Sequence, residues 1–572
     1  MKFTTVAFAL VALASSAVSF PLDSIIGNVL CVNSHAEGIN ALTKSHSSCS
    51  KILVDNEATS SSTLPSTGAN ARAMDGGFRQ GLMLRSLRYP RLLASALGRP
   101  LGSSGLRQAR LAHSKRPRVV VLGSGWAGFE LLRRLDKRQY DVTLVSPRNY
   151  FVFTPLLAST SVGTLEFRCI VEPVRSKSSD IKYYEATCDN VDVDQQTIQC
   201  TSGLDNNRQS FTLPYDQLIV TVGAQTNTFN TPGVTEHALF LKDIKDARNI
   251  RQRVIDCFEK ASQPFATDQQ QRQLLHFAVV GGGPTGVEFS AELNDFIRDD
   301  LSRIYPHLMD KVRMTVYDVA PTILGSFDVN LAKYAVKRFQ RQGIKIRTNT
   351  QITEVTKDHL MIRNQPEEPY GLLVWSTGLT DVPLSQSLAK TVANDAHGKR
   401  LLTDFHLRLL RSDGTMAINN VFALGDCADI TGYSLPATAQ VARQKARYLA
   451  QVLNRVGRVQ GWTLNDEKQF TYQHLGSMAY LGGWKAIVDL GADGDPKAGT
   501  VPEEVNAVTN PFSSAAAKRR PLRLTDYIGE GRLAWLFWRS AYFTMSVSLK
   551  NKILIPVYWF LTWLLGRDIS RF

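Results

Sequence analysis

The sequence has no two cysteines in a Cys-x-x-Cys spacing, and its seven cysteines are scattered. They are Cys31, Cys49, Cys169, Cys188, Cys200, Cys257 and Cys427. This spacing argues against a disulfide framework, a zinc site with closely paired ligands and a redox-active dithiol. We therefore expect isolated thiols that pack as small apolar side chains, and no bound metal.

Long apolar runs and a basic central region are missing as well. No run reaches the roughly 18 to 20 apolar residues that a membrane-spanning helix needs. The net charge of +15 is concentrated at the two ends: residues 1–118 contain 14 basic and 5 acidic residues, and residues 515–572 contain 10 and 3. The middle is nearly neutral, whereas a nucleic-acid-binding core would carry a basic face. We expect no nucleic-acid partner.

The N-terminal 117 residues carry two targeting patterns. Residues 1–20 are similar to a secretory signal, with one lysine, a short apolar run and small residues. Residues 83–118 contain nine Lys and Arg and no Asp or Glu, which is typical of a mitochondrial transit peptide. Since both signals cannot act in one mature protein, we expect residues 1–117 to be a disordered targeting region. In this reading residues 83–117 direct mitochondrial import and translation starts at Met83 or Met74; secretion is the alternative.

A glycine motif follows the first apolar strand of the expected folded region. Val119–Leu122 leads into Gly123-Ser124-Gly125-Trp126-Ala127-Gly128 and then a helical stretch. A G-x-G-x-x-G turn between strand and helix predicts a dinucleotide site with the diphosphate on the helix N-terminus. The next strand ends at Ser146-Pro147-Arg148, without the usual acid. Ser146 is a candidate for one ribose bond, and Arg148 for the adenosine phosphate side.

The pattern recurs about 160 residues later. Phe277–Val280 leads into Gly281-Gly282-Gly283-Pro284-Thr285-Gly286, and the following strand, Val312–Tyr317, ends at Asp318. An acid there can hold both ribose hydroxyls and would repel a 2′-phosphate, which favours NADH over NADPH. Two copies, each between strand and helix, predict two dinucleotide sites.

A third apolar strand, Val421–Leu424, ends at Gly425-Asp426. In flavoproteins with two dinucleotide sites, an Asp at this place binds the ribityl chain of FAD. The segments Tyr215–Gly223 and Leu372–Gly378 predict the crossings between the two domains, with Gly378 close to the cofactors. We therefore expect an α/β fold of two nested Rossmann-like domains. FAD would be bound by residues 118–240 and 386–460, and NADH by the inserted residues 272–385.

Residues 531–572 interleave aromatic and basic side chains. The longest uncharged stretch, Ile553–Gly566, has 14 residues and contains Pro556, so it is too short to span a bilayer. This composition is typical of helices in the membrane interface, with aromatic rings at headgroup depth and cations facing anionic lipid. A helical pair packed on the domain or at a dimer interface is the alternative, and both can hold. We expect residues 461–572 to serve membrane anchoring or dimerisation.

From about residue 117 onward the chain resembles the type II, or alternative, NADH dehydrogenases of mitochondria and bacteria. The matching segments are GSGWAG at Gly123–Gly128, SPRNYFVFTPLL at Ser146–Leu157, VVGGGPTGVEFSAEL at Val279–Leu293, FALGD at Phe422–Asp426 and PATAQVARQ at Pro436–Gln444. The resemblance implies a non-covalent FAD that passes electrons from NADH to ubiquinone without proton pumping. It also implies a homodimer bound peripherally to lipid on one side of the mitochondrial inner membrane.

The resemblance further implies roles for single residues. Thr154 and Pro155 would lie against the isoalloxazine, and Glu288 would stand beside the nicotinamide. Gln440 and Gln444, four apart on one helix face, would line the quinone entry. An ordinary helix glutamate and two solvated glutamines are the alternatives.

Two other functions have the same architecture. One is a ferredoxin or disulfide reductase; the missing Cys-x-x-Cys argues against the disulfide type, and the membrane-like tail against a soluble acceptor. The other is a signalling flavoprotein similar to apoptosis-inducing factor, which the near-neutral core disfavours. A calcium loop at Asp489–Thr500 is not expected, because Gly491 and Thr500 occupy ligand positions three and twelve.

Overall fold

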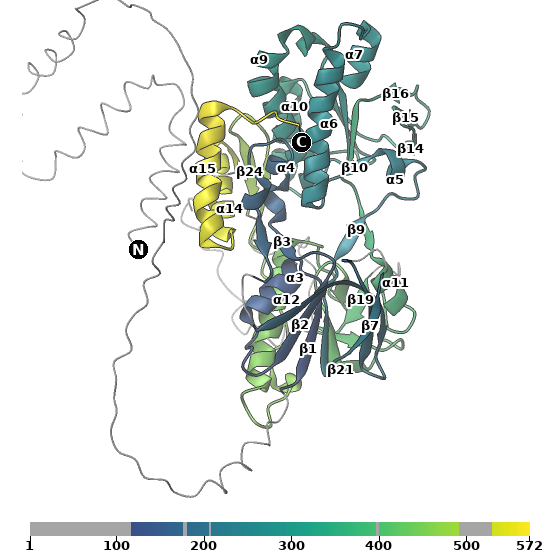
Figure 1. The fold of residues 1–572 in the computed structure, drawn as a ribbon, viewed down its shortest axis with the longest axis vertical. Coiled ribbons are helices and arrows are strands. Elements are labelled where there is room, and N and C mark those ends of the chain that lie inside the picture. The colour runs from purple at the N-terminus through teal and green to yellow at the C-terminus, as the bar shows by residue number, and fades with distance from the viewer. Residues whose placement is uncertain (1–115, 176–179, 205–207, 396–399, 491–528, 572) are drawn as a thin grey trace, which may run out of the picture. The chain divides into compact units, whose positions relative to one another are not determined.

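The computed structural model of the protein describes residues 116–175, 180–204, 208–395, 400–490 and 529–571 (Figure 1). The two expected targeting segments, with Met74 and Met83, lie outside these residues apart from the last few positions. Most of the segment Asp489–Thr500 also lies outside them.

A ten-stranded sheet has the order β22-β19-β20-β21-β8-β1-β2-β5-β6-β7. β1 lies between β2 and β8 and runs parallel to both, and β21 runs parallel to β8. The sheet thus joins strands from two separate stretches of the chain, as a domain with an insertion requires. Its strands are β1 (Arg118–Leu122), β2 (Asp141–Ser146), β5 (Ile181–Asp192), β6 (Thr197–Ser202), β7 (Ser210–Pro214), β8 (Gln217–Val220), β19 (Leu401–Thr403), β20 (Arg408–Leu410), β21 (Ala417–Ala423) and β22 (Ala428–Ile430).

Helices cover this large sheet. α3 (Trp126–Arg134) and α12 (Ala439–Val456) pack together on one face (Figure 1). Side chains alternate between the faces of a strand, so Val121 of β1 packs with these two helices. Leu122 instead joins the cluster that includes α11 (Pro383–Leu388).

A second sheet of five parallel strands has the order β10-β17-β11-β12-β13. Every residue of β11 is buried, as is typical of a parallel strand covered on both faces. α6 (Ile244–Ala261), α8 (Pro284–Phe296) and α10 (Val329–Gln342) contribute to the core on one face, and strands β14 and β15 on the other. The strands of this region are β10 (Leu239–Phe240), β11 (His276–Val280), β12 (Arg313–Tyr317), β13 (Lys345–Arg347), β14 (Ile352–Val355), β15 (His359–Ile362), β16 (Glu368–Pro369) and β17 (Leu372–Trp375).

Two short strands mark the passage between the sheets. β9 (Ala224–Thr226) follows β8, β18 (Leu379–Asp381) follows β17, and the two pair antiparallel. The chain therefore leaves and re-enters the region of the large sheet at one place. Because β10 already belongs to the second sheet, this crossing lies before residue 240, where we expected the first FAD-binding segment to end.

Shorter elements complete the two regions. They are β3 (Tyr150–Val152), β4 (Val171–Pro173), α4 (Leu157–Thr160), α5 (Val234–His237), α7 (Asp268–Leu274), α9 (Ser302–Ile304), the 3₁₀ turns Thr154–Leu156, Phe167–Cys169, Pro306–Lys311 and Leu464–Asp466, and a π-helical turn, Ile297–Leu301, that continues α8.

The C-terminal segment packs against the helices of the second sheet. β23 (Ser477–Tyr480), β24 (Ala486–Asp489) and β25 (Glu530–Gly531) form an antiparallel sheet. β23 contacts α8, and β24 contacts α14 (Arg532–Met545). α14 and α15 (Leu549–Leu565) lie side by side (Figure 1). Among the described helices, none is both long and apolar enough to cross a membrane.

The aromatic side chains of α14 and α15 do not all face outward, which corrects the expectation of rings at headgroup depth. Trp535, Trp538, Tyr542 and Trp559 are buried in the hydrophobic core shared with the second sheet. Arg567 also turns inward, and its Nη1 lies 2.7 Å from Asp300 Oδ2. Large rings gain more from burial in a core than from a half-wet interface.

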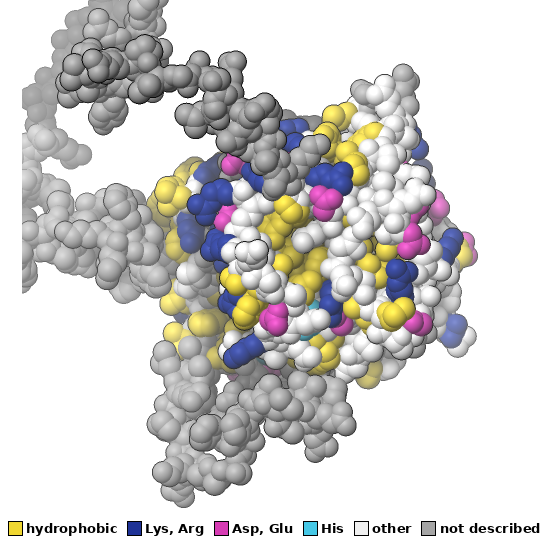
Figure 2. Space-filling model, turned by 90° about the horizontal axis from the view of Figure 1, so that it is seen from below, with side chains coloured by type: hydrophobic (Ala, Val, Ile, Leu, Met, Phe, Trp, Pro, Cys, Tyr) yellow, Lys and Arg dark blue, Asp and Glu magenta, His cyan; other side chains and the backbone are white. Residues whose placement is uncertain are grey.

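Other side chains of the same helices remain exposed and apolar. We call this set the apolar surface of α14 and α15: Leu533, Phe537, Leu549, Ile553, Val557, Phe560, Leu561, Trp563, Leu564 and Leu565. In Figure 2, hydrophobic side chains lie along the edge where these two helices are seen in Figure 1. A soluble monomer rarely exposes so many apolar side chains together. The two helices thus pack on the domain, as in the alternative, and contact of their exposed side chains with a membrane stays a prediction.

Candidate functional site

The first glycine turn has the geometry of a diphosphate site. Gly123 has a φ of +101°, and a Cβ there would lie 2.6 Å from the Thr221 carbonyl oxygen. A Cβ on Gly128 would lie 2.0 Å from the Gly123 carbonyl oxygen, so α3 starts directly against the turn. At Gly125, in contrast, no described atom lies within 4 Å of such a Cβ. The turn is tight towards the protein and open at the N-terminus of α3, where free amide groups favour an anion.

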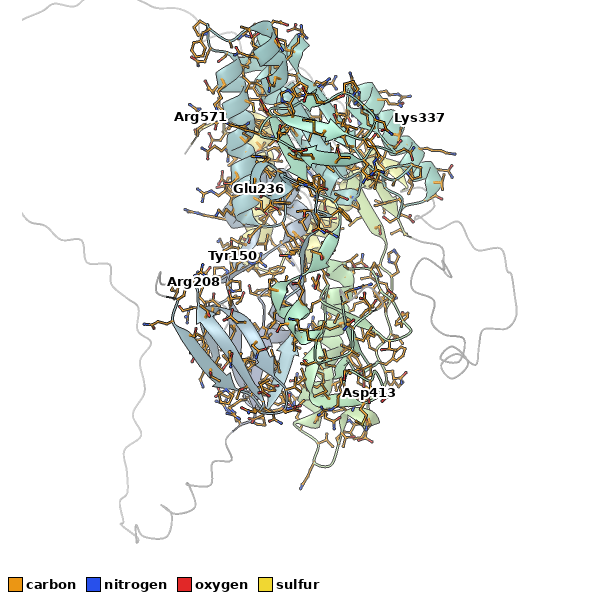
Figure 3. All side chains as sticks on the ribbon, turned by 90° about the vertical axis from the view of Figure 1, so that its right-hand side faces the viewer. Tyr150, Arg208, Glu236, Lys337, Asp413 and Arg571 are labelled. Carbon is orange, nitrogen blue, oxygen red and sulfur yellow. The ribbon has the colours of Figure 1, made fainter. Side chains whose placement is uncertain are left out.

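Ser124 and Ser146 join this turn to the end of β2. Their hydroxyl oxygens are buried and 2.9 Å apart. Arg148, two residues further, donates from Nη1 to Asp243 at 2.9 Å, and the hydroxyl of Tyr150 donates to the same carboxylate at 3.1 Å. Asp243 caps α6 of the second sheet, so these bonds fasten the glycine-turn region to the inserted region near Tyr150 (Figure 3).

Trp126, inside the glycine motif, connects the turn with the segment expected at the isoalloxazine. Its Nε1–H donates to the Thr154 hydroxyl at 3.0 Å. Thr154 is exposed and Pro155 half-buried, so both are accessible from outside the core. Arg443 of α12 lies over the Trp126 ring at 5.8 Å and 3.9 Å from the carboxylate of Glu130. Arg443 therefore holds α12 against α3.

Glu130 is buried among four arginines of α3 and α12. Burial alone would raise its pKa, but hydrogen bonds from Arg447 and Arg134 and the nearby charge of Arg443 outweigh burial, so its pKa lies below the ordinary value. The two hydrogen bonds measure 2.7 Å and 2.6 Å. This cluster fixes the helix that carries the expected quinone residues.

Asp426 follows β21 and interacts with a lysine that our sequence reasoning missed. The amino group of Lys242 is buried and has no hydrogen-bond partner among the described residues. Burial raises the pKa of Asp426 while the charge of Lys242 opposes this shift. Burial lowers the pKa of Lys242, and the charge of Asp426 opposes that shift in turn. The only signal in the sequence is a lysine directly after the short apolar stretch Leu239–Leu241.

The second glycine turn repeats the geometry of the first. Gly281 has a φ of +114°, and a Cβ on Gly286 would lie 2.0 Å from the Gly281 carbonyl oxygen. No described atom lies within 4 Å of a Cβ placed on Gly283. The opening again faces the N-terminus of a helix, here α8.

Asp318 lies next to the second glycine turn and binds its backbone. Its carboxylate accepts the Gly282 N–H at 2.5 Å and the Ala320 N–H at 2.8 Å. Backbone groups thus hold the carboxylate at the carboxyl end of β12, where a residue that binds both ribose hydroxyls is expected.

Glu288 lies on α8, two residues after the second turn, and is buried. Its Oε1 accepts the Tyr480 N–H at 3.1 Å and the Trp538 Nε1–H at 3.1 Å. Burial raises the pKa of Glu288 to about 8, although both hydrogen bonds act in the opposite direction. The C-terminal segment encloses the carboxyl group, and a place for Glu288 beside the nicotinamide stays a prediction.

Further acids on α8 are buried beside Glu288. Glu292 accepts the Ser159 hydroxyl at 2.6 Å and the Thr164 hydroxyl at 2.9 Å. Asp295 accepts the Tyr480 hydroxyl at 2.6 Å, and burial raises its pKa to about 6. Ser159 belongs to α4, just after Thr154 and Pro155, so α8 contacts the segment expected at the isoalloxazine as well as the C-terminal segment.

Gln440 and Gln444 lie on one side of α12 and bind the same loop, Tyr472–Gly476. Gln440 donates from Nε2 to the Gly476 carbonyl at 2.6 Å and accepts the Leu475 N–H at 3.1 Å. Gln444 donates to the Gln473 carbonyl at 2.8 Å and accepts the Gln473 N–H at 3.0 Å. Neither amide is simply solvated; together they clamp the loop onto α12.

Gly378 lies at the crossing between the sheets. Its φ is +71°, and a Cβ there would lie 2.6 Å from the Phe229 ring. The close approach shows why glycine is required at the crossing.

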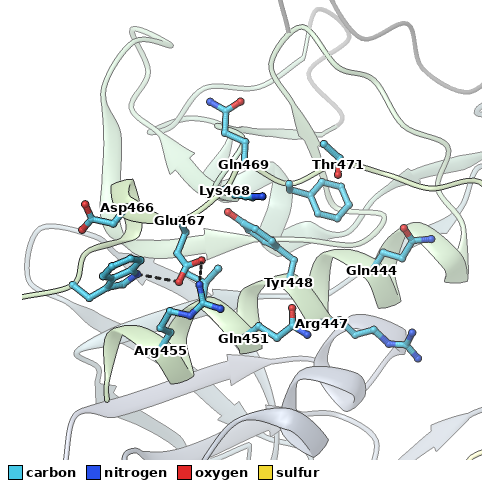
Figure 4. A pocket seen from close by; sticks show the side chains of 13 residues that line it. Gln444, Arg447, Tyr448, Gln451, Arg455, Asp466, Glu467, Lys468, Gln469 and Thr471 are labelled. Carbon is cyan, nitrogen blue, oxygen red and sulfur yellow. Dashed lines mark hydrogen bonds and ion pairs between the residues drawn. The ribbon is translucent and has the colours of Figure 1, made fainter. Parts of the chain in front are cut away.

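A pocket of about 700 Å³ lies over the second half of α12 (Figure 4). Residues 462–471 line its other side, and of the expected site residues it contains Gln444 but neither glycine turn. We therefore do not assign a nucleotide to it. In the part of the chain that the structure describes, no cluster of three His, Cys, Asp or Glu could hold a metal, and the five described cysteines are buried free thiols.

Comparison with protein families gives two matches. A model of the pyridine nucleotide-disulphide oxidoreductase family matches residues 117–446, and a model of the NDH2 C-terminal domain matches residues 521–568. Both glycine turns, Asp318, Asp426 and the two glutamines fall within the first match.

Curated proteins and solved structures extend this likeness. The mitochondrial internal alternative NAD(P)H-ubiquinone oxidoreductase A1 of Arabidopsis thaliana is 38% identical over 80% of this chain and 86% of its own length. The mitochondrial external NADH-ubiquinone oxidoreductase 2 of Saccharomyces cerevisiae is 37% identical over 80% of this chain and 82% of its own. The structure of NDH2 from Plasmodium falciparum in complex with NADH covers 80% of this chain and 100% of its own, with 27% identity and a TM-score of 0.69.

The raised pKa of Glu288 predicts a pH-dependent stability. In the unfolded chain, Glu288 loses its proton above its ordinary pKa of 4.5. In the folded protein, Glu288 keeps this proton up to about pH 8. Folding stability should therefore fall with rising pH across this window, by on the order of 1.4 kcal/mol per pH unit for this group. Glu288→Gln removes the titration, and its amide oxygen can keep both hydrogen bonds. The variant should match the wild type near pH 4.5 and become progressively more stable towards pH 8.

Thermal unfolding between pH 4.5 and 8.5 measures this difference. Glu236→Gln, at an exposed position on α5 (Figure 3), is the control and should run parallel to the wild type. A constant offset between Glu288→Gln and the wild type at all pH values would mean that Glu288 is ionised in the folded protein.

Proposed function

The chain belongs to the family of type II, or alternative, NAD(P)H-ubiquinone oxidoreductases, and we propose that it oxidises NADH through a non-covalent FAD and reduces ubiquinone. It acts at the mitochondrial inner membrane as a peripheral enzyme, without pumping protons. The observation that carries the proposal is the presence of two diphosphate-type glycine turns on two sheets that meet at the β9–β18 crossing. Two dinucleotides held this way can exchange a hydride when their reactive rings face each other.

FAD is assigned to the first turn. Three observations support this assignment: the open space at Gly125, the half-buried carboxyl group of Asp426, whose pKa burial raises, and the partnerless amino group of Lys242. FAD, when bound, accepts a hydride from NADH and supplies two electrons to a quinone. Thr154, which accepts the Trp126 Nε1–H, and Pro155, which follows it, would position the flavin ring.

NADH is assigned to the second turn. Gly283 leaves room for the diphosphate, and Asp318 would accept both ribose hydroxyls. Glu288 follows this turn by two residues. Its pKa is about 8, so its carboxyl group can hold a proton near neutral pH. We propose that its protonated carboxyl group borders the nicotinamide without adding a negative charge there.

The quinone side is assigned to α12 and the loop that it clamps. Gln440 and Gln444 fix the backbone of Tyr472–Gly476, and Arg443 packs on Trp126 of the first turn. The loop and the flavin side of the first turn are therefore connected by one helix. We propose that the loop forms the wall of the quinone entry.

The apolar surface of α14 and α15 is assigned to the lipid surface. It exposes leucines and aromatic rings next to basic residues such as Lys550 and Lys552, a combination that favours an anionic membrane interface. A homodimer is part of the proposal on the strength of the family likeness, and analytical ultracentrifugation in detergent tests it. The soluble-acceptor and signalling functions lack a comparable supporting feature.

The decisive activity experiment compares two electron acceptors. Purified protein should contain FAD and oxidise NADH with ubiquinone-1 at least as well as with ferricyanide. Reduction of ferricyanide alone would contradict ubiquinone as the acceptor, and protein without FAD after refolding with FAD would contradict the flavin assignment.

Asp318 predicts the choice between NADH and NADPH. Asp318→Asn removes the negative charge that would repel a 2′-phosphate. The preference for NADH in kcat/KM should narrow by about 10-fold, equivalent to about 1.4 kcal/mol. Asp310→Asn, exposed in the same domain, should leave the preference unchanged. An unaltered preference in Asp318→Asn would mean that another residue selects the nucleotide.

Gln440 predicts a separation of the two half-reactions. Gln440→Leu should release the loop Tyr472–Gly476 and obstruct the quinone entry without touching the second glycine turn. Flavin reduction by NADH in a stopped-flow experiment should stay near normal, and ferricyanide reduction should largely survive. Steady-state quinone reduction should fall by on the order of 100-fold, the cost of a substrate misplaced by about 1 Å. Gln451→Leu, exposed on the same helix, is the control. Equal slowing of flavin reduction would place Gln440 in the nicotinamide site or the fold.

The apolar surface predicts membrane attachment. Deleting residues 531–572 would also remove Trp538, which binds Glu288, and Arg567, which binds Asp300, so substitution of exposed residues is the sharper test. The triple variant Leu533→Ser, Leu549→Ser, Leu565→Ser should lose most binding to anionic vesicles in a flotation assay, while a triple variant at exposed Leu204, Phe265 and Met416 should bind normally. Unchanged flotation of the first variant would contradict the assignment.

A further inference from the structure

Lys242 has a buried amino group whose structural role the protein alone does not explain. Nζ is inaccessible to solvent and has no hydrogen-bond partner among the described residues. A buried ammonium without a partner is destabilising and rare unless something compensates it. The lysine side chain is long and flexible, so it would reach water if the surrounding structure only had to accommodate it.

The backbone around Lys242 is fixed rather than loose. Lys242 lies between β10 and α6, and its N–H donates to Asp246 at 2.9 Å. The N–H of Asp243 donates to the same carboxylate at 2.8 Å, and Asp243 in turn binds Arg148 and Tyr150. This loop is therefore anchored both to α6 and to the segment that follows the first glycine turn. The hydrogen bonds that hold this loop therefore also hold the Lys242 side chain in its buried position.

Two charged groups near the Lys242 amino group have opposite effects on its pKa. Asp426, after β21, favours its charge, and Arg148, after β2, disfavours it. Asp426 is the residue expected at the ribityl chain, and Arg148 is the one expected near the adenosine phosphate. The loop that carries Lys242 is also tied to the first glycine turn, because Asp243 binds Arg148 and the Arg148 carbonyl accepts the Ser124 hydroxyl at 3.1 Å.

The charges of this site are incomplete without an anion. The first turn of α3 has no acidic residue and no side-chain cap in the described structure. Arg148 is already paired with Asp243, whereas the Lys242 amino group has no hydrogen-bond partner among the described residues. A diphosphate carries two negative charges and matches the combination of a free helix N-terminus and a buried ammonium.

We propose that Lys242 is a FAD-binding residue whose ammonium group pairs with the diphosphate held by the Gly123–Gly128 turn. The inference rests on the proposed FAD site and assigns a residue from the inserted region to it. Because Lys242 precedes α6 directly, the bound diphosphate would also link the two nested regions at this loop.

The experiment uses the full chain stripped of FAD, and measures FAD affinity and thermal stability of the same preparations. Lys242→Met should weaken FAD binding by about 10- to 100-fold, the range of one charge-assisted hydrogen bond, while Lys242→Arg should retain most of the affinity. The FAD-free Lys242→Met protein should melt at the same or a higher temperature than the FAD-free wild type, because a buried unpaired charge is removed. Lys245→Met, exposed at the start of α6, is the control for both readouts.

The outcomes separate this inference from the proposed function. If the wild type does not bind FAD, the proposed function fails. If the wild type binds FAD and Lys242→Met binds it equally well, only the assignment of Lys242 fails. A strongly lowered melting temperature of FAD-free Lys242→Met would make Lys242 a structural residue and overturn the proposal. A changed flavin midpoint potential with unchanged affinity would place the ammonium at the flavin ring and overturn the diphosphate assignment.

Discussion

The burial of acidic side chains on α8 is the constraint on which the rest of the structure depends. Nearly every residue of this helix is buried, including Glu288, Glu292 and Asp295. A buried carboxyl group must be neutral, hydrogen-bonded or paired with a cation. The donors come from far along the chain: Trp538 reaches Glu288, Tyr480 reaches Asp295, and Ser159 reaches Glu292. These distant segments must therefore meet at α8 if its buried acids are to have hydrogen-bond donors.

This constraint makes the C-terminal segment part of the region that we propose binds NADH. The N-terminus of α8 carries the second glycine turn, and its continuation carries Asp300, which binds Arg567 after α15. The helices that expose an apolar surface therefore complete the core around the helix that would bind NADH. Arg539, half-buried on α14, adds to this core: its guanidinium lies 4.5 Å from the Trp535 ring centroid and 4.3 Å from that of Trp559. A membrane contact at the apolar surface would reach α8 through directly packed side chains.

Features encoded in neighbouring residues could be predicted from the sequence. Each glycine turn, with Asp318 or Asp426 at a strand end, depends on a few consecutive residues whose backbone requirements are local. Lys242 and Arg567 could not be predicted, because their environments are made by residues from distant parts of the chain. The orientation of α14 and α15 was equally inaccessible: both are apolar around most of their circumference, so periodicity does not tell which rings face the core. The domain limit near residue 240 depends on which sheet β10 joins. A strand of two residues is too short for its sequence to indicate which sheet that is.

The most direct test of the account is hydrogen exchange in Arg567→Met. If the C-terminal segment and α8 form one cooperative unit, removing the cation that binds Asp300 should increase amide exchange in α8 together with α14 and α15. Arg571→Met, which removes only an exposed ion pair with Asp256 at 2.9 Å, should leave all three helices protected. Faster exchange confined to α15, with α8 unchanged, would contradict the account and make the C-terminal helices a separate anchor.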